Sequence, residues 1–362
     1  MRLLIEAANC TIAVVDGVIA EPDGHFDQII KVPDGELHPG LINAHDHLRL
    51  NHFGRLGNPH YANAYLWARD IQAREKETIR RGRTIPRRAA LLHGAWKNLL
   101  AGVTHVMHHD FWEADFEREF PVQVLRMAFA DSLGMTPDMA PPPGLPFTLH
   151  VAEGIDTAAA EEVRTLDARG LLTPDLIAVH LVGPDTDGIA RIGNSGCGVT
   201  WCPSSNHFLF GRTTPAALLT AGGDVLLGTD SLLTGAGDLL DELRYARSLN
   251  ILSDSRLLDA VGAVAARRFG LPPHSLAIGA TANLVVFRKP ILEAEARDVA
   301  LVMSKGALRV LDPLLGPVPA HGRIISHKGS RRWIGETYYT GEIDRTDETG
   351  HTDAAGIRTY IG

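Results

Sequence analysis

Histidine and aspartate side chains recur at the ends of short apolar runs in this sequence. His45 and His47 stand two apart after one such run, and His150, His180 and Asp230 each end another. In a strand, residues i and i+2 point to the same side, so the first two imidazoles can face one point. Imidazoles combined with a carboxylate are ligands for zinc and similar divalent metals. We therefore expect a divalent metal, with zinc ahead of iron or manganese.

Two further residues could complete a hydrolytic site. A bound metal lowers the pKa of water to near 7, which makes hydroxide available at neutral pH. Glu153 lies three residues after His150, where it could reach that water and then the leaving group. His180 could either ligate the metal or polarise the substrate. The pattern predicts hydrolysis by metal-activated hydroxide, with Glu153 as the proton shuttle.

Polar residues that follow the same strands are candidates for substrate contacts. They are Asn51, Arg55, His108, His109 and Asn206. For each of them the alternative is a supporting role, either in a loop or in a polar shell that orients metal ligands. Most of the other histidines among the 17 in the chain are expected on the surface or satisfied in the core.

The strands that carry these residues should be parallel. After the run 41–47, apolar runs occur at 103–108, 122–129, 147–151, 176–181, 199–202 and 225–228. Amphipathic stretches with helical spacing separate several of them, and this alternation predicts an α/β fold of the TIM-like (β/α) barrel type. The runs number seven rather than eight, and a Pro/Gly-rich stretch fills 132–146. We expect a distorted barrel in which one βα unit is lost or reduced to a loop.

Both ends of the chain are rich in β-forming residues. Residues 1–38 contain short strands with Asp-Gly turns, and residues 271–325 are β-like again. We expect these two segments to form one small β-sandwich domain, while residues 39–270 form the metal-binding barrel. Residues 326–362 are expected to be a polar C-terminal tail, extended or partly disordered.

Composition limits the classes of partner. The chain has 362 residues and a formal net charge of -8, which argues against nucleic acid or an anionic membrane as a partner. No apolar run approaches the ~20 residues needed to span a bilayer. The three cysteines match no zinc ribbon or redox pair, and the N-terminus lacks the pattern of a signal peptide. We expect a reduced, cytoplasmic protein that acts on a small molecule.

The motifs HPGLINAHDH, LHVAEG, VHLVG, CPSSN and LLGTDS occur in this order between residues 38 and 231. Together they resemble the amidohydrolase superfamily, in the branch of cytosine, guanine and adenosine deaminases and triazine hydrolases. The resemblance implies that His45, His47, His150 and Asp230 ligate the metal. It implies that Glu153 is the general acid and base, that His180 positions or polarises the attacked group, and that Asp230 also accepts a proton. A homo-oligomer is a further expectation by analogy.

Two observations refine this expectation. Two-metal members of the superfamily typically use a carboxylated lysine as a bridge, and this chain has no lysine between Lys97 and Lys289, so we expect one metal. The segment 48–70 differs from the usual deaminase substrate segment. The predicted reaction is hydrolytic deamination of a nitrogen heterocycle. The alternatives are hydrolysis of another C–N or C–X bond, in a cyclic amide or a substituted triazine-like ring, and a non-catalytic metal-binding scaffold.

Overall fold

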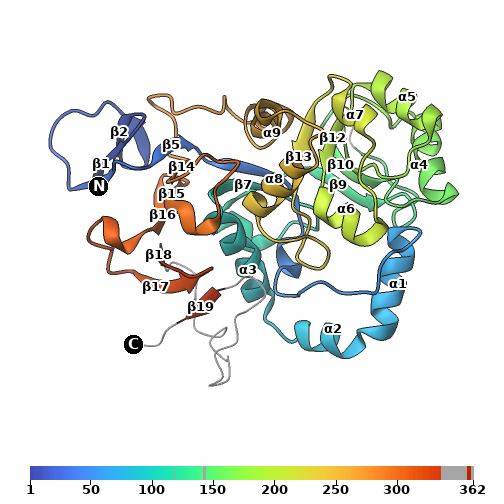
Figure 1. The fold of residues 1–362 in the computed structure, drawn as a ribbon, viewed down its shortest axis with the longest axis horizontal. Coiled ribbons are helices and arrows are strands. Elements are labelled where there is room, and N and C mark those ends of the chain that lie inside the picture. Colours follow the sequence, from blue (N-terminus) through green and yellow to red (C-terminus); the bar gives the residue numbers. More distant parts are fainter. Residues whose placement is uncertain (119, 142–143, 336–356, 360–362) are drawn as a thin grey trace.

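The structure, a computed structural model, describes residues 1–118, 120–141, 144–335 and 357–359. A part rich in strands, built from both ends of the chain, lies beside a part in which helices surround the strands of the middle of the chain (Figure 1). No helix among the described residues combines the length and the apolar character that crossing a membrane requires.

The strands of the middle part are parallel, as predicted. A three-stranded sheet contains β6 (Leu41–Asp46), β7 (Val103–His108) and β8 (Gln123–Leu125). A five-stranded sheet contains β9 (Ala128–Ser132), β10 (Phe147–Val151), β11 (Leu176–His180), β12 (Gly198–Trp201) and β13 (Val225–Leu227). Every residue of β6, β10, β11 and β12 is buried, which explains why these strands read as continuous apolar runs.

The predicted strand 122–129 is divided in two. Its first part, β8, pairs with β7, and its second part, β9, pairs with β10. Only Arg126 and Met127 separate the two parts, so a single stretch of chain joins the two parallel sheets. The described residues between β9 and β10 form neither helix nor strand, in agreement with the Pro/Gly-rich sequence there.

Helices follow most of these strands. A 3-10 turn, η1 (Leu48–Leu50), leads from β6 to α1 (Ala64–Arg74), α2 (Lys76–Gly82) and α3 (Arg87–Leu100). The later helices are α4 (Thr157–Ala168), α5 (Thr186–Ser195), α6 (Pro203–Phe210), α7 (Ala216–Thr220), α8 (Leu239–Ser248), α9 (Asp254–Ala260) and α10 (Ala263–Arg268). Asp156, Asp185 and Asp238 accept hydrogen bonds from backbone N–H groups in the first turns of α4, α5 and α8, and these caps fix where the helices begin.

The two chain ends meet in one sheet. A four-stranded sheet contains β1 (Arg2–Ala7), β2 (Thr11–Val15), β3 (Val18–Ala20) and β4 (Gln28–Val32). A seven-stranded sheet contains β5 (Glu36–Pro39), β14 (Leu284–Phe287), β15 (Val299–Ser304), β16 (Ala307–Leu311), β17 (Gly322–His327), β18 (Ser330–Gly335) and β19 (Ile357–Thr359). In this sheet β5 pairs antiparallel with β14. Buried side chains of both sheets, among them Ile5, Leu301 and Trp333, belong to one hydrophobic cluster.

The seven-stranded sheet extends past the predicted start of the C-terminal tail at residue 326. β17 crosses that boundary, and β18 lies wholly beyond it. Trp333 and Ile334 are buried, with exposed fractions of 1% and 0%. The neighbouring Arg331 and Arg332 make the segment look polar in sequence, although its last four residues, Arg332 to Gly335, are buried. The remainder of the predicted tail, 336–356 and 360–362, lies outside the described residues.

Replacement of Trp333 by alanine should destabilise the protein, because removal of its fully buried indole would leave a cavity between the two sheets. We expect the free energy of unfolding to fall by about 3–5 kcal/mol, measured by chemical denaturation. The matched control is Arg331→Ala, since Arg331 is exposed on the same strand. Equal, small effects of both substitutions would contradict the placement of β18 in the core.

Candidate metal centre

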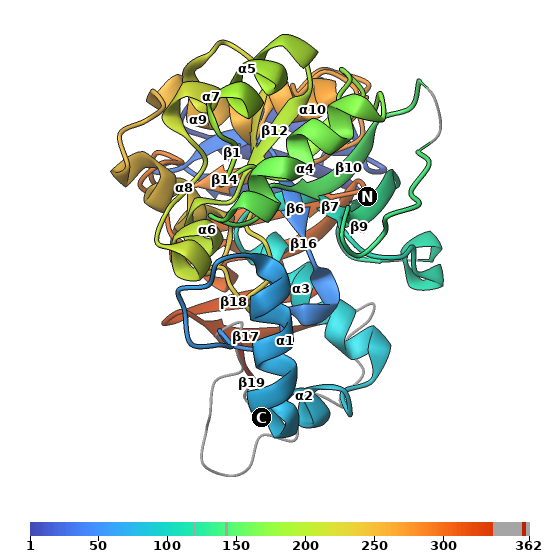
Figure 2. The same cartoon turned by 90° about the vertical axis from the view of Figure 1, so that its right-hand side faces the viewer.

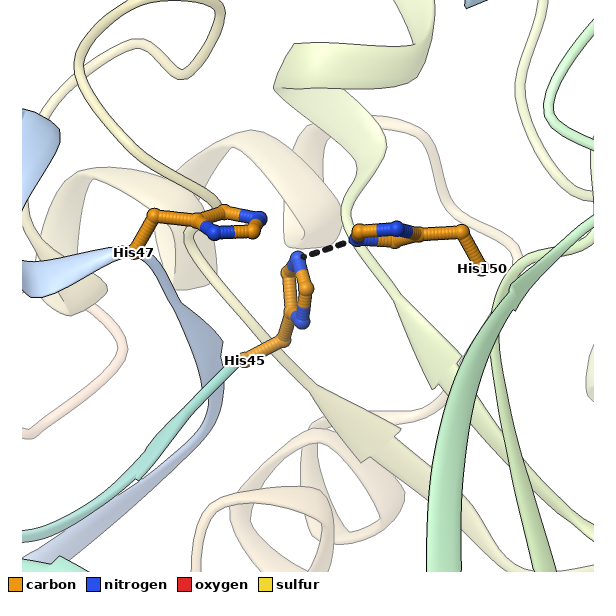
Figure 3. A group of neighbouring side chains, drawn as sticks. All are labelled: His45, His47 and His150. Carbon is orange, nitrogen blue, oxygen red and sulfur yellow. Dashed lines mark hydrogen bonds between the residues drawn. The ribbon is translucent and has the colours of Figure 1, made fainter. Parts of the chain in front are cut away.

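Three imidazoles converge at the C-terminal ends of β6 and β10. Figure 3 shows the rings of His47 and His150 facing each other, with the His45 ring between and below them. The Nε2 atoms of His45 and His150 are 3.3 Å apart. The His45 ring is nearly perpendicular to the other two, at 89° and 85°. Two imidazoles bound to one tetrahedral zinc have their nitrogens roughly 3.3 Å apart, so this spacing fits a shared metal.

Asp230, just after β13, brings a carboxylate to the same point. Its Oδ1 lies 3.8 Å from Nε2 of His45 and 3.9 Å from Nε2 of His47. Nitrogen and oxygen atoms of His45, His47 and His150, and likewise of His45, His180 and Asp230, lie within 4.8 Å of one another. The set of nitrogen and carboxylate donors therefore fits a divalent ion such as zinc.

The outer ring nitrogens of two candidate ligands face carboxylates. Nδ1 of His47 donates to Asp110 at 3.3 Å, and Nδ1 of His150 approaches Asp131 at 3.4 Å. Such partners fix each ring and direct Nε2 toward the centre. Burial acts to lower the pKa of His47, but the contact with Asp110 outweighs it and raises the pKa to about 9, so a metal would displace a proton from this ring. Asp131 ends β9, and its role was missed from sequence although it follows the same strand-end pattern.

The Asp230 carboxylate is oriented and kept charged. Oδ1 accepts the backbone N–H of Ser231 at 2.6 Å, and Oδ2 accepts the hydroxyls of Ser205 and Thr234, each at 2.8 Å. Burial acts to raise the pKa of this carboxyl, but the charge of His47 and these hydrogen bonds outweigh it and lower the pKa to about 2. The carboxylate is thus ionised at neutral pH and suited to hold a cation.

Backbone strain accompanies these positions. His180 and Asp230 have φ angles of 74° and 55°, and Ala152, which precedes Glu153, has 50°. A residue other than glycine in this left-handed region costs of order 1–3 kcal/mol, and such strain gathers at functional sites. Here it turns the chain sharply where the side chains leave the strands.

Glu153 and His180 lie side by side at the edge of the centre. Oε1 of Glu153 is 3.6 Å from Nε2 of His180. Burial, together with the charge of Asp230, raises the pKa of Glu153 well above its usual value, which favours the protonated carboxyl. Burial lowers the pKa of His180 to about 4, which keeps this ring neutral. Nδ1 of His180 donates to Asn206 at 2.8 Å, and this leaves the lone pair on Nε2.

A cavity of about 200 Å³ opens over the centre. Its wall includes His47, His150, Glu153, His180 and Asp230. It also includes Arg49, Tyr65, Trp67, Asp131, Met135 and Glu162, which the sequence did not indicate. Glu162 accepts the Tyr65 hydroxyl and the backbone N–H of Ala152, and so supports the strained turn before Glu153.

None of the five residues predicted to contact substrate lines this cavity. Asn51 donates to Asp46 and accepts the backbone N–H of Leu232, and the Arg55 guanidinium donates to backbone oxygens after Asp230. His108 accepts the backbone N–H of Leu48. Their geometry corresponds to the supporting alternative, in which they brace the loops around the centre.

The other two of the five are in direct contact with histidines of the centre. Asn206 orients His180, as described above. His109 stacks on His150, with ring centroids 4.1 Å apart, and its own nitrogens face Ala130 O and the Thr148 hydroxyl. Burial lowers the pKa of His109 well below its usual value, so a neutral ring backs the ligand.

The last lysine before the long lysine-free stretch is held beneath the centre. Nζ of Lys97 lies 2.9 Å from Oδ2 of Asp46, and it donates to the Thr229 hydroxyl and the Asp230 backbone oxygen. Lys97 is 3% exposed and is therefore committed to this ion pair.

Comparison with known proteins gives related sequences for parts of the chain. A model of the Amidohydrolase family matches residues 143–309. The aminodeoxyfutalosine deaminase of Deinococcus radiodurans is 41% identical over 26% of this chain and 23% of its own length. The 5-methylthioadenosine/S-adenosylhomocysteine deaminase of Pelotomaculum thermopropionicum is 32% identical over 43% of this chain and 40% of its own length. The matched segments thus span less than half of these relatives.

Solved structures match over most of the chain. An adenosine deaminase from Xanthomonas campestris with bound zinc has a TM-score of 0.66 and 20% identity, over 88% of this chain and 94% of its own. Atrazine chlorohydrolase from Arthrobacter aurescens with zinc has a TM-score of 0.64 and 17% identity, over 87% and 97%. The resemblance to amidohydrolases that the motifs indicated is confirmed, and the fold is of the type these enzymes share.

Replacement of His47 by alanine should remove a metal ligand while leaving the strand intact. We expect zinc affinity to fall by more than about 100-fold, since loss of a ligand costs more than loss of its outer partner. Metal analysis after dialysis of zinc-loaded protein measures this. The control is His25→Ala, an exposed position outside the centre. Full zinc occupancy in His47→Ala would mean that the ligand set is wrong.

Proposed function

We propose that this chain, a relative of amidohydrolases, is a metal-dependent hydrolase that deaminates a nitrogen heterocycle. The observation that carries the proposal is the pair Glu153 and His180, 3.6 Å apart at the edge of the histidine and aspartate cluster. A purely structural metal site would not require a buried carboxyl that holds a proton beside it. The cavity over the centre offers room for a small-molecule substrate.

We propose His45, His47, His150 and Asp230 as ligands of one divalent ion, zinc first. When bound, this ion lowers the pKa of a water molecule that it ligates to near 7. The spacing of the Nε2 atoms and the orientation of the rings by Asp110 and Asp131 support the assignment. A second ion bridged by a lysine is disfavoured, because Lys97 is paired with Asp46.

The side chains around the ion then divide the proton transfers. Asp230, ionised and fixed by Ser205 and Thr234, accepts a proton from the attacking water. Glu153 carries a proton to the departing ammonia, because its raised pKa favours a carboxyl that holds a proton. His180, neutral and with its lone pair on Nε2, positions the ring that is attacked.

We also propose the finer architecture that this function requires. The two parallel sheets form a distorted barrel that closes between β13 and β6, where the Asp230 N–H donates to the His45 oxygen at 3.1 Å. One βα unit is reduced to a loop between β9 and β10, where the described residues form neither helix nor strand. Residues 1–38 and 271–325, extended to residue 335 by β17 and β18, form a β-sandwich domain, supported by the cluster their sheets share, while 39–270 form the barrel. The three free cysteines fit the expected cytoplasmic location.

A second candidate is hydrolysis of another C–N or C–X bond, for example in a substituted triazine-like ring. The structural likeness to atrazine chlorohydrolase is the observation that favours this second candidate. The same proton carrier and ligands would serve, since only the leaving group differs.

Ammonia release by zinc-loaded protein over purines, pyrimidines, pterins and triazines distinguishes the candidates. We expect release from at least one ring class. Release of chloride or an alkylamine without ammonia would favour the second candidate. Zinc binding with no product from any compound would contradict deamination and favour a scaffold.

Replacement of Glu153 by glutamine should preserve the shape of the site and remove the proton carrier. We expect zinc content to stay unchanged and kcat to fall by at least about 100-fold. The matched control is Glu161→Gln on α4, which is exposed and outside the cavity. Full activity of Glu153→Gln would rule out the proposed mechanism.

A further inference from the structure

A second cavity, of about 510 Å³, adjoins the one over the metal centre. The two cavities share wall residues, namely Arg49, Leu50, Trp67, Ala68, Asp131 and Leu233. We call the second cavity the side chamber. Most of its wall residues come from η1, α1, α2 and the start of α3 and from the loops between them, an excursion of the chain that follows β6. Figure 2 shows α1 and α2 of this excursion in the lower half of the view. This excursion contains the segment whose sequence departs from the usual deaminase pattern.

The walls of the side chamber are mainly apolar. Phe53, Leu56, Ile71, Ile79 and Leu233 form one hydrophobic cluster, with Leu50 and Trp67 packed against it. Trp67 is fixed because its Nε1 donates to the Leu56 backbone oxygen at 2.9 Å. The side chamber is thus lined by side chains that pack against one another.

The charged wall residues of the chamber differ in their contacts. The Arg49 guanidinium makes two contacts of 3.2 Å with Asp110, Arg87 pairs with Glu113, and Asp131 approaches His150, whereas Arg83 is exposed. Burial lowers the pKa of His52, so this wall residue is neutral. Because apolar side chains predominate in the wall, an apolar group that entered would gain from burial.

We infer that the side chamber binds an apolar arm, alkyl or aryl, of the substrate whose heterocycle lies over the metal centre. The inference rests on the proposed function and names its substrate class. The observation that supports the inference is that the two cavities are continuous, because Ala68 and Trp67 of α1 line both of them. Ala68 is the smallest of the shared side chains, so a larger residue there would narrow the passage.

The test uses zinc-loaded protein and 9-alkyladenines with methyl, propyl and hexyl arms. Equilibrium dialysis gives Kd, and ammonia release gives kcat/KM. We expect Kd to fall by about fourfold per added methylene, which corresponds to about 0.8 kcal/mol per buried CH₂ group. Ala68→Met should abolish this dependence on chain length. Ala73→Met, the same change at an exposed position of α1, should retain the dependence.

Failure of the inference differs from failure of the proposed function. Turnover of 9-methyladenine with no gain for longer arms, or equal gains in native protein and Ala68→Met, would overturn the inference and leave deamination standing. If no adenine releases ammonia, deamination of this ring is contradicted, and binding of hexylbenzene tests the chamber alone. If hexylbenzene raises the Tm of native protein but not that of Ile79→Phe, in which the larger side chain fills the chamber, the inference is supported. If hexylbenzene changes the Tm of both proteins equally, or of neither, the inference is overturned.

Discussion

The ion pair between Lys97 and Asp46 underlies the whole candidate site. Asp46 lies between His45 and His47 in the chain, and Lys97 reaches from α3 to both Asp46 and the backbone oxygen of Asp230. A buried ion pair is tolerated only when its remaining hydrogen-bonding groups are satisfied. Asn51 and Asn98 donate to Asp46, and Thr229 accepts from Lys97. This network joins the first and last strands of the parallel set at the depth of the metal centre.

Above that network, three histidines of the centre are each held by a partner from another element. Asp110 after β7 holds His47, Asp131 at the end of β9 holds His150, and Asn206 of α6 holds His180. The centre therefore depends on the relative positions of nearly all the parallel strands. The left-handed backbone at His180 and Asp230 is a local cost that these contacts compensate.

The excursion after β6, which contains α1 and α2, supplies the apolar part of the site. α1 and α2 bring apolar side chains to the side chamber, whereas acidic groups, among them Glu153 and Asp230, line the cavity over the metal centre. The acidic groups suit proton transfer to a heterocycle, and the apolar side chains suit a substituent.

The sequence by itself determined the strands and the residues at their ends. Continuous apolar runs predict buried parallel strands, and a strand end fixes where its last side chains point, so His45, His150, His180 and Asp230 could be assigned together. The division of 122–129 into β8 and β9 was not visible, because both parts have the same pattern and differ only in their pairing partner. The boundary at residue 326 was misplaced since two arginines hid the buried Trp333 and Ile334. Only tertiary structure decided that Asp131 and Asp110 orient ligands, that His109 backs one, and that the side chamber opens beside the centre. These are contacts between segments far apart in the chain, and no local periodicity encodes them.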